Sequence, residues 1–382
     1  MASLTTDSEL GNAAGRPTRL AAAEAAANAG LRYVGDDEPG YRRRRRGSGF
    51  SYLKPDGSAL NDERERRRCD DLVIPPAWRD VWICRTADGH LQATGRDEAG
   101  RKQYLYHPRW TAVRDAAKFA ALAGFGESLP SLRRRLRRDL KAGSLTRRRL
   151  TAAVLRLMDQ TLIRVGNSSY AKANGSYGVT TLRNKHVRLS GAEIDLSFTG
   201  KLGEKHLHSL VDEELAEIVR ECQELPGYEL FRYRDEFGLV QTIDSRDVND
   251  YLREVTTKES SAKDFRTWGG TVAAAKALHE VAFESRNGKA APPGPEAGSS
   301  PEVREAARNK AVVEAVKVAA LTLGNTPAIC RQSYVHPLII ESFLAGEFRR
   351  LYAEAVAAAR AKRPGDLRLH KAATLRFLLA AR

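Results

Sequence analysis

The sequence predicts an α+β protein in which a small N-terminal antiparallel β-sheet domain precedes a larger, mainly α-helical domain with a small β element. Short runs that alternate apolar and polar residues, separated by turn-forming Pro, Asp and Gly, fill residues 41–108 and are typical of antiparallel strands. From residue 109 onward, apolar residues recur mostly at helical spacing. A chain of 382 residues is long enough for two or three domains.

The N-terminal region divides into two predicted segments. Residues 1–40 are rich in Ala, Gly and acidic residues and show little periodicity, so we expect a partly disordered leader. A β-rich domain is expected over residues 41–108. Its expected strands include the alternating runs Gly49–Tyr52, Val81–Cys84 and Leu91–Thr94.

Residues 109–382 form the predicted helical domain. Its cleanest apolar stripe runs from Leu150 to Leu162, and Gly166 is expected to cap this helix. Residues 287–301, rich in Pro, Gly and Ser, are expected to form a flexible loop. An earlier helix is expected to present Trp110, Val113, Ala117 and Ala120 on one face. Strands are expected at Val179–Leu182, His186–Leu189, Ile194–Phe198 and His206–Leu210, the last two joined by a Gly200–Gly203 hairpin.

The charge of the chain indicates a polyanionic partner. There are 63 Lys and Arg against 48 Asp and Glu, a formal net charge of +15, and the pI is about 9.8. A membrane surface is disfavoured because no stretch approaches the roughly 18 uninterrupted apolar residues of a spanning helix. The four cysteines lie far apart with no C-x-x-C pair, which favours reduced thiols. We therefore expect a cytoplasmic protein that lies alongside DNA or RNA.

Three arginine runs concentrate this charge. Two of them, at residues 133–138 and 147–149, fall in helical sequence, where such runs are more often solvated faces than specific readers. In a chain this basic they are also candidates for phosphate contacts, which add affinity without sequence information. The third run, a candidate DNA-binding set, consists of Arg42, Arg43, Arg44, Arg45 and Arg46.

Several common catalytic motifs are missing from the sequence. It has neither a G-x-x-x-x-G-K-[ST] phosphate loop nor a G-x-G-x-x-G turn after a strand, so ATP hydrolysis is not indicated. His206 and His208 alternate on a presumed strand and could share a metal, but two surface strand histidines are the more common case. A DNA enzyme without these signatures would need covalent catalysis with cationic stabilisation.

Four segments contain residues suited to that chemistry. Taken singly, each has an ordinary structural explanation: Arg164 could complement a helix dipole, a turn lysine such as Lys201 is usually solvated, and Arg266 could stack on Trp268. Tyr334 could be an ordinary half-buried tyrosine. The segments are Leu162-Ile-Arg-Val-Gly-Asn167, Phe198-Thr-Gly-Lys201, Lys263-Asp-Phe-Arg-Thr-Trp-Gly269 and Leu323-Gly-Asn-Thr-Pro-Ala-Ile-Cys-Arg-Gln-Ser-Tyr334.

Together these segments resemble the type IB DNA topoisomerases, in particular the small bacterial and poxvirus forms. The segment around Arg164, with Gly178-Val-Thr-Thr-Leu-Arg-Asn-Lys-His186 downstream, is similar to the one that carries the family's first arginine. Phe-Thr-Gly-Lys201 resembles the hairpin lysine, and Lys263-Asp-Phe-Arg-Thr resembles the segment of the second arginine. Leu-Gly-Asn325-Thr-Pro resembles the segment of the nucleophile. The resemblance covers about residues 41–350 and includes Gly100–His107 and Ile74–Trp78.

The resemblance implies a two-lobed, C-shaped clamp around duplex DNA, of the fold shared with tyrosine recombinases. It implies transient cleavage of one strand through a 3′-phosphotyrosyl intermediate and rejoining, which relaxes supercoils without ATP, cofactor or required metal. The partner is duplex DNA, with no membrane and no small-molecule substrate, and we expect a bacterial, nucleoid-associated monomer. The implied catalytic residues are Tyr334, Arg164, Lys201, Arg266 and Asn325, and the implied DNA contacts are Gln103, Tyr104, Tyr106 and Lys263 together with the run at 42–46.

Two positions depart from the pattern of the relatives. Many of them have His where this chain has Asn325, and a carboxamide donates a hydrogen bond but exchanges no proton near neutral pH. Leu202 stands beside the lysine where the poxvirus pattern has an acidic residue. Asn325 is therefore expected to stabilise charge rather than to move protons.

Two alternative functions remain open at this point. A tyrosine recombinase would use similar chemistry, but Lys263 occupies the position of the usual recombinase histidine, and residues 41–108 look β-rich rather than helical. A basic architectural DNA-binding protein would explain the charge and would leave the four segments to chance.

Overall fold

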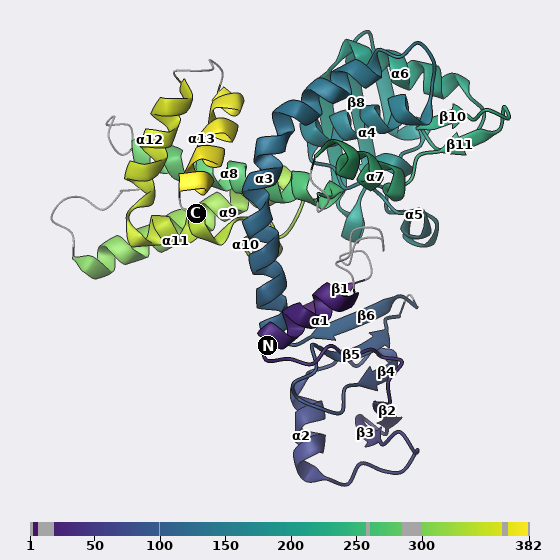
Figure 1. The fold of residues 1–382 in the computed structure, drawn as a ribbon, viewed down its shortest axis with the longest axis vertical. Helices are drawn as coiled ribbons and strands as arrows, with labels where there is room; N and C mark the ends of the chain where they lie inside the picture. The colour runs from purple at the N-terminus through teal and green to yellow at the C-terminus, as the bar shows by residue number, and fades with distance from the viewer. Residues whose placement is uncertain are drawn as a thin grey trace. The chain divides into compact units, whose positions relative to one another are not determined.

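The computed structural model describes residues 3–6, 19–98, 100–256, 260–284, 300–360 and 366–380. The chain divides into two compact units, Met1–Lys118 and Phe119–Arg382, so the division falls inside helix α3 (Pro108–Leu140) rather than at its start (Figure 1). The predicted order, a β-sheet domain followed by a mainly helical domain with small sheets, is confirmed.

The first unit is built on an antiparallel sheet. Among the described residues the sheet has six strands in the order β1-β6-β5-β4-β2-β3, and every neighbouring pair is antiparallel. The expected runs at 49–52, 81–84 and 91–94 are confirmed as strands, and the basic run at 42–46 is itself a strand. The strands are β1 (Ser3–Thr6), β2 (Tyr41–Arg46), β3 (Gly49–Leu53), β4 (Arg79–Ile83), β5 (Leu91–Arg96) and β6 (Lys102–Tyr106).

Both faces of this sheet are covered, because alternate residues of a strand point to opposite faces. Val81 and Ile83 of β4 face a cluster that includes Cys69 of α2 (Glu63–Asp71). Trp82 faces the other cluster, which includes Ala26 of α1 (Arg19–Asn28). Helix α1 thus belongs to the segment expected as a partly disordered leader, while residues 7–18 of that segment lie outside the described residues.

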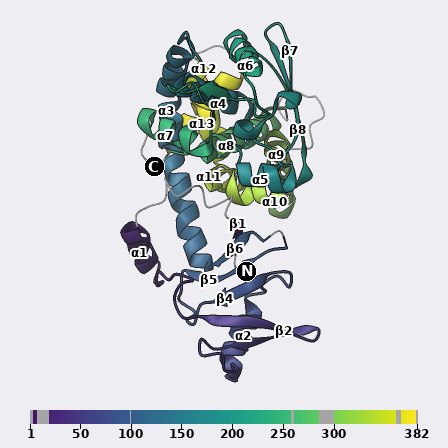
Figure 2. The ribbon, with the colours of Figure 1, turned by 90° about the vertical axis from the view of Figure 1, so that its right-hand side faces the viewer.

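The second unit combines helices with two small sheets. Strands β7 and β8 run side by side, with β9 on the other side of β8 (Figure 2). Its further helices are α4 (Arg147–Thr161), α5 (Ser168–Asn174), α6 (Glu213–Glu224), α7 (Ser245–Val255), α8 (Ala262–Glu284), α9 (Pro301–Leu323), α10 (Pro327–Ser333), α11 (Pro337–Ala345), α12 (Phe348–Arg360) and α13 (Asp366–Ala380). Its strands are β7 (Val187–Ser190), β8 (Glu193–Thr199), β9 (Lys205–Val211), β10 (Arg232–Arg234) and β11 (Val240–Thr242).

Local details differ from the predictions. The stripe of α4 is buried as expected, but the helix ends at Thr161 with Leu162 in the left-handed region (φ 57°), so Gly166 does not cap it. The expected strand at 179–182 is a 3-10 turn. Along α3, Ala117 and Ala120 are exposed, while Phe119 and Leu122 are buried. Of the expected flexible loop at 287–301, residues 287–299 lie outside the described residues.

Two further features concern the environment of the protein. In the described ranges, no single helix is long and apolar enough to cross a membrane; α9 and α10 meet that test by length and composition only as a pair, bent by 94°. All four cysteines are buried and unpaired.

Candidate active site

Arg164 lies in an extended segment that follows the end of α4. The backbone of this segment is held by the turn at 178–181: Val179 N donates to Arg164 O (2.8 Å), and Thr180 N donates to Val165 O (2.7 Å). A Cβ atom at position 178 would lie 2.5 Å from Arg164 O, so only glycine permits this approach. The two sequence pieces that were expected to belong together are therefore joined by backbone hydrogen bonds.

Asn325 lies in the sharp break between α9 and α10. Gly324 ends α9 in the left-handed region (φ 55°), and Thr326 caps α10 through Ile329 N. Arg164 Nη2 donates to Asn325 Oδ1 at 2.9 Å. Asn325 Nδ2 is buried and has no hydrogen-bond partner among the described residues. Because buried polar groups are almost always hydrogen-bonded, this amide donor is suited to a ligand oxygen.

Arg266 connects the chain segments on which Arg164 and Asn325 lie. It is on the first turns of α8 and is only 3% exposed. Its Nη1 donates to Leu162 O (2.6 Å), just beyond α4, and its Nη2 donates to Leu323 O (2.8 Å), at the end of α9. Burial and then the charge of Arg164 lower the pKa of Arg266 to about 10, so it stays cationic at neutral pH.

Tyr334 is placed by α8 and by the end of α10. Thr271 Oγ1 donates to Tyr334 O at 3.2 Å, and a Cβ at Gly270 would lie 2.8 Å from the same oxygen, so a glycine is needed there. The guanidinium of Arg266 lies over the Tyr334 ring, with 5.2 Å between Cζ and the ring centroid. Arg266 therefore stacks on Tyr334. The spacing in the sequence had also allowed it to stack on Trp268, and it does not do so.

The charges around Tyr334 favour its ionised form. Burial by itself would raise the pKa of the phenol, but Arg266, Lys263 and Arg164 outweigh it, and the pKa lies below its ordinary value. Lys263, on the same helix as Arg266, thus contributes to the site through its charge. A phenol with a lowered pKa next to cations is an activated oxygen nucleophile.

Lys201 lies in the turn between β8 and β9, and the hairpin predicted here is confirmed. Strands β8 and β9 pair from Thr199 and Lys205 outward, and Gly200 N donates to Glu204 O (2.7 Å) to close the turn. The lysine is half-buried in a single 3-10 turn.

The histidines of β9 are not the surface pair that we expected. His206 is buried, and its ring stacks on Phe198 and on His208. No group of three or more His, Cys, Asp or Glu side chains suited to a metal ion occurs within the described ranges. Sequence reasoning missed Gly270 and Thr271 as parts of this site, and it considered His206 only as one of two surface or metal-binding histidines. The places of these three residues come from packing, and no local motif marks them.

The basic strand β2 divides into exposed arginines and one structural arginine. Arg43 donates to the backbone oxygens of Ile74, Pro75 and Trp78 at 2.7–2.9 Å, and it lies 4.1 Å from the centroid of the Phe50 ring. The guanidinium of Arg43 thus binds β2 to the loop before β4 through these hydrogen bonds. The exposed members of the run are Arg42, Arg44, Arg45 and Arg46.

The expected DNA-contacting residues of β6 also differ in exposure. Gln103 is buried, and its amide donates to Asp97 at 2.8 Å. Tyr104 is half-buried and stacks on Tyr106, which is buried (ring centroids 6.0 Å apart). Lys102 lies over the Tyr104 ring. Of the three candidates, Tyr104 therefore has the most side-chain surface open to a ligand.

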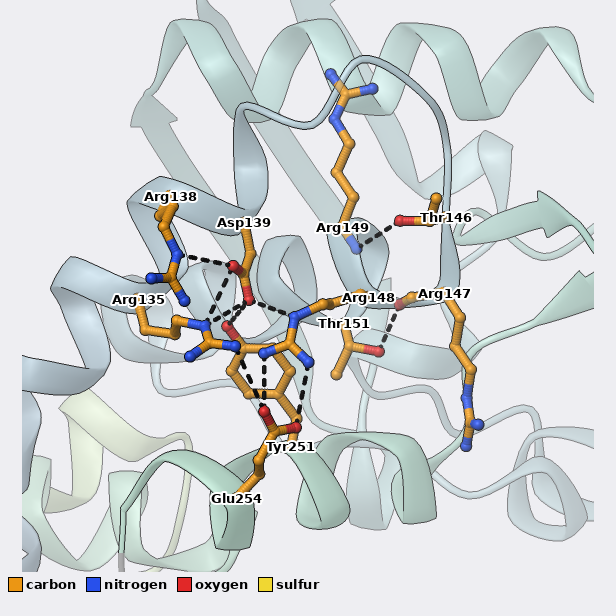
Figure 3. A network of polar contacts seen from close by, with 10 residues as sticks. All are labelled: Arg135, Arg138, Asp139, Thr146, Arg147, Arg148, Arg149, Thr151, Tyr251 and Glu254. Carbon is orange, nitrogen blue, oxygen red and sulfur yellow. Dashed lines mark hydrogen bonds and ion pairs between the residues drawn. The ribbon is translucent and has the colours of Figure 1, made fainter.

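The two helical arginine runs are largely engaged within the protein. Figure 3 shows Arg135 and Arg148 converging on Asp139, which also accepts a hydrogen bond from Tyr251 at 2.8 Å. Both arginines also contact Glu254. Arg133 pairs with Asp159, Arg147 with Asp247 and Arg149 with Glu221. These contacts favour a structural role over the phosphate contacts that we considered for these runs.

Both units match families of known proteins. Residues 107–344 match the family model described as the catalytic core of eukaryotic DNA topoisomerase I, and residues 49–97 match the N-terminal domain of bacterial DNA topoisomerase IB. The chain is 31% identical over 308 residues to DNA topoisomerase 1B of Acanthamoeba polyphaga mimivirus, which covers 80% of this chain and 87% of that protein. It is 24% identical over 273 residues to DNA topoisomerase 1B of Vaccinia virus (strain Copenhagen) and to DNA topoisomerase I of Monkeypox virus, covering 71% of this chain and 76% of each relative.

The fold and these matches define the class of enzyme as a DNA topoisomerase. Because the catalytic-core match spans more than half of the chain and the mimivirus relative is 31% identical, the chain belongs to the type IB DNA topoisomerases, in their bacterial and viral form. Its substrate is DNA, so the recombinase and architectural alternatives are no longer favoured. The five residues singled out for catalysis all lie within the matched core.

Proposed function

We propose that this enzyme relaxes supercoiled duplex DNA by cutting one strand through a 3′-phosphotyrosyl link at Tyr334 and then resealing it, without ATP or a required metal. The observation that carries the proposal is the phenol of Tyr334 beside the buried cation of Arg266, with its pKa lowered by three nearby charges. All five proposed catalytic side chains belong to one unit of one chain, so a monomer suffices.

Tyr334 enters the first step as the phenolate, its proton having passed to solvent. A bond then forms between Tyr334 Oη and the scissile phosphorus, and the bond from that phosphorus to the 5′ oxygen breaks. Negative charge grows on the nonbridging oxygens as the bonds change, and donors fixed in advance stabilise it. Arg164 and Arg266 supply cationic donors, and Asn325 supplies its unpartnered Nδ2. Two of the five N–H groups of Arg266 are held by carbonyls, and its Nε–H has no partner among the described residues.

Lys201 completes the step by giving a proton to the departing 5′ oxygen, which leaves as a hydroxyl. While the link persists, the DNA downstream of the break rotates and supercoils relax. The 5′ hydroxyl then returns its proton to Lys201 and attacks the phosphotyrosine, and Tyr334 leaves as the phenolate. The bond energy is conserved in this exchange, so no ATP is consumed.

Plasmid relaxation tests the proposal as a whole. Purified protein in excess EDTA and without ATP should convert negatively supercoiled plasmid to relaxed circles. Tyr334→Phe keeps the ring and removes the nucleophilic oxygen, so relaxation and the covalent protein–DNA adduct should both vanish while DNA binding persists. An adduct that persists in this variant would assign the nucleophile to another tyrosine, and dependence on metal would overturn the metal-free mechanism.

The role of Lys201 has its own test. A positioned general acid typically contributes about 10²–10⁴-fold. Lys201→Ala should therefore cleave an ordinary substrate far more slowly than wild type. A substrate with sulfur at the bridging 5′ position has a leaving group that needs no proton, so this variant should cleave it at nearly the wild-type rate. Equal defects on both substrates would show that Lys201 positions the phosphate instead.

A further inference from the structure

His206 lies near the start of β9, an edge strand of the three-stranded sheet of the second unit. It lies on β9 directly opposite Phe198 of β8, and the two rings stack with centroids 5.0 Å apart and planes 9° apart. His208 stacks on it from the next position on the same face, at 5.9 Å. The ring is buried, so these neighbours restrict its movement.

The ring of His206 contacts two glycines that each precede a proposed catalytic residue. A Cβ at Gly200, the neighbour of Lys201, would lie 2.5 Å from His206 Cδ2 and Nε2. A Cβ at Gly324, the neighbour of Asn325, would lie 2.6 Å from His206 Cε1. Two adjacent sides of one rigid ring, which meet at Nε2, therefore contact the Lys201 turn and the α9–α10 break.

The ring is neutral at the pH at which the enzyme would act. Burial, followed by the charges of His208, Arg164 and Arg266, lowers its pKa to about 4. A neutral ring adds no positive charge to a site that already contains several cations. The short distances from the ring to both glycines make its contact with the two loops a steric one.

We propose that His206 is a positioning residue that sets the spacing between the turn carrying Lys201 and the break carrying Asn325. This rests on the proposed roles of Lys201 and Asn325. Both contacts are made at glycines, where the missing side chain leaves the space that the ring fills, so the ring limits how closely the two loops can approach each other. A misplacement of about 1 Å in a catalytic group can cost about 10²-fold in rate.

The test compares His206→Ala with His208→Ala, which removes a ring from the same face of β9 without touching either glycine. His206→Ala should slow single-turnover cleavage of ordinary DNA about 10- to 10²-fold. The defect should shrink several-fold on the substrate with a bridging 5′ sulfur, because the misplaced Lys201 is then dispensable. His208→Ala should stay near wild type on both substrates. Equal defects on both substrates, or no defect, would overturn the proposal.

A second pair of variants keeps the test decisive if His206→Ala folds poorly. Gly200 has φ −96°, which any residue adopts, so the obstacle to Gly200→Ala is the His206 ring itself. Gly200→Ala should show the same sulfur-sensitive defect as His206→Ala. In the His206→Ala background, the added methyl group enters the vacated space and should cost little more. Additive defects would show that the two residues act independently and would refute the proposal.

Lys201→Ala in the same assay separates this inference from the proposed function. If Lys201→Ala is rescued by sulfur and His206→Ala is not, the positioning role fails while the acid role stands. If Lys201→Ala is itself not rescued, the acid role fails, and a sulfur-selective defect in His206→Ala would then have no explanation.

Discussion

Removing the charge of Arg266 should move the pH dependence of DNA cleavage upward. The guanidinium carbon lies 5.2 Å from the centroid of the Tyr334 ring; Arg266 is buried and Tyr334 is half-buried. At an effective dielectric constant of about 20, one unit charge at this distance stabilises a phenolate by about 3 kcal/mol, or about 10²-fold. Arg266→Gln should therefore raise the pKa of Tyr334 and reduce the phenolate fraction at any given neutral pH.

The upward shift of the pH profile can be measured separately from the other effects of Arg266→Gln. Arg266 also stabilises the phosphate in the proposed mechanism, so Arg266→Gln should slow cleavage at every pH, by about 10²–10³-fold for a missing donor. The smaller phenolate fraction slows cleavage further only at pH values below the pKa of Tyr334. In single-turnover cleavage measured from about pH 6 to 10, the variant should therefore gain rate with rising pH over a range shifted upward from that of wild type.

Arg266→Lys is the matched control. It keeps a positive charge near the ring, so its pH profile should stay close to that of wild type. The lysine side chain cannot reproduce the two hydrogen bonds that the guanidinium donates to Leu162 O and Leu323 O. Each carbonyl left without a donor costs about 1–3 kcal/mol, so the Tm of this variant should fall. A profile in folded Arg266→Gln that coincides with that of wild type would refute the assignment of Arg266 as the cation that activates Tyr334.

Three further outcomes follow from the structure. Changing the exposed arginines of the run at 42–46 to Gln should flatten the slope of log affinity for DNA against log salt concentration by about 0.9 for each phosphate that is no longer neutralised, and an unchanged slope would rule out phosphate binding by this run. Arg43→Gln should mainly lower Tm, because its donors are engaged by backbone carbonyls. Gly178→Ala should destabilise the enzyme by about 1–3 kcal/mol through its clash with Arg164 O, and Gly143→Ala, with open space around it, should be near neutral in the same thermal melts. Asp139→Asn should cost about 1–3 kcal/mol in denaturant unfolding, because Asp139 accepts from two arginines and Tyr251; an unchanged free energy of unfolding would mean that the network of Figure 3 adds little.

The sequence by itself determined the order of the two domains and the candidate chemistry. Alternation with a period of two and turn residues at 41–108 sufficed for the β-sheet domain, because strand patterns and turn chemistry are local properties. The Gly200–Gly203 hairpin and the helix break at Gly324-Asn325-Thr326-Pro327 are also local, since they depend on glycine, capping and proline. The resemblance to type IB topoisomerases rested on such segments, and the family comparisons confirm it.

Only the tertiary structure decided which charges meet. Arg266 could reach Trp268 by spacing, yet it lies over Tyr334, because Gly270 of α8 lets the end of α10 approach closely. Arg43 and Arg148 look like their neighbours in sequence, but a carbonyl and a carboxylate far along the chain, Ile74 O and Glu254, engage them. His206 is one of two similar strand histidines, and its position between Gly200 and Gly324 follows from packing across more than a hundred residues of chain. Such contacts depend on how distant surfaces fit together, and no local pattern encodes that fit.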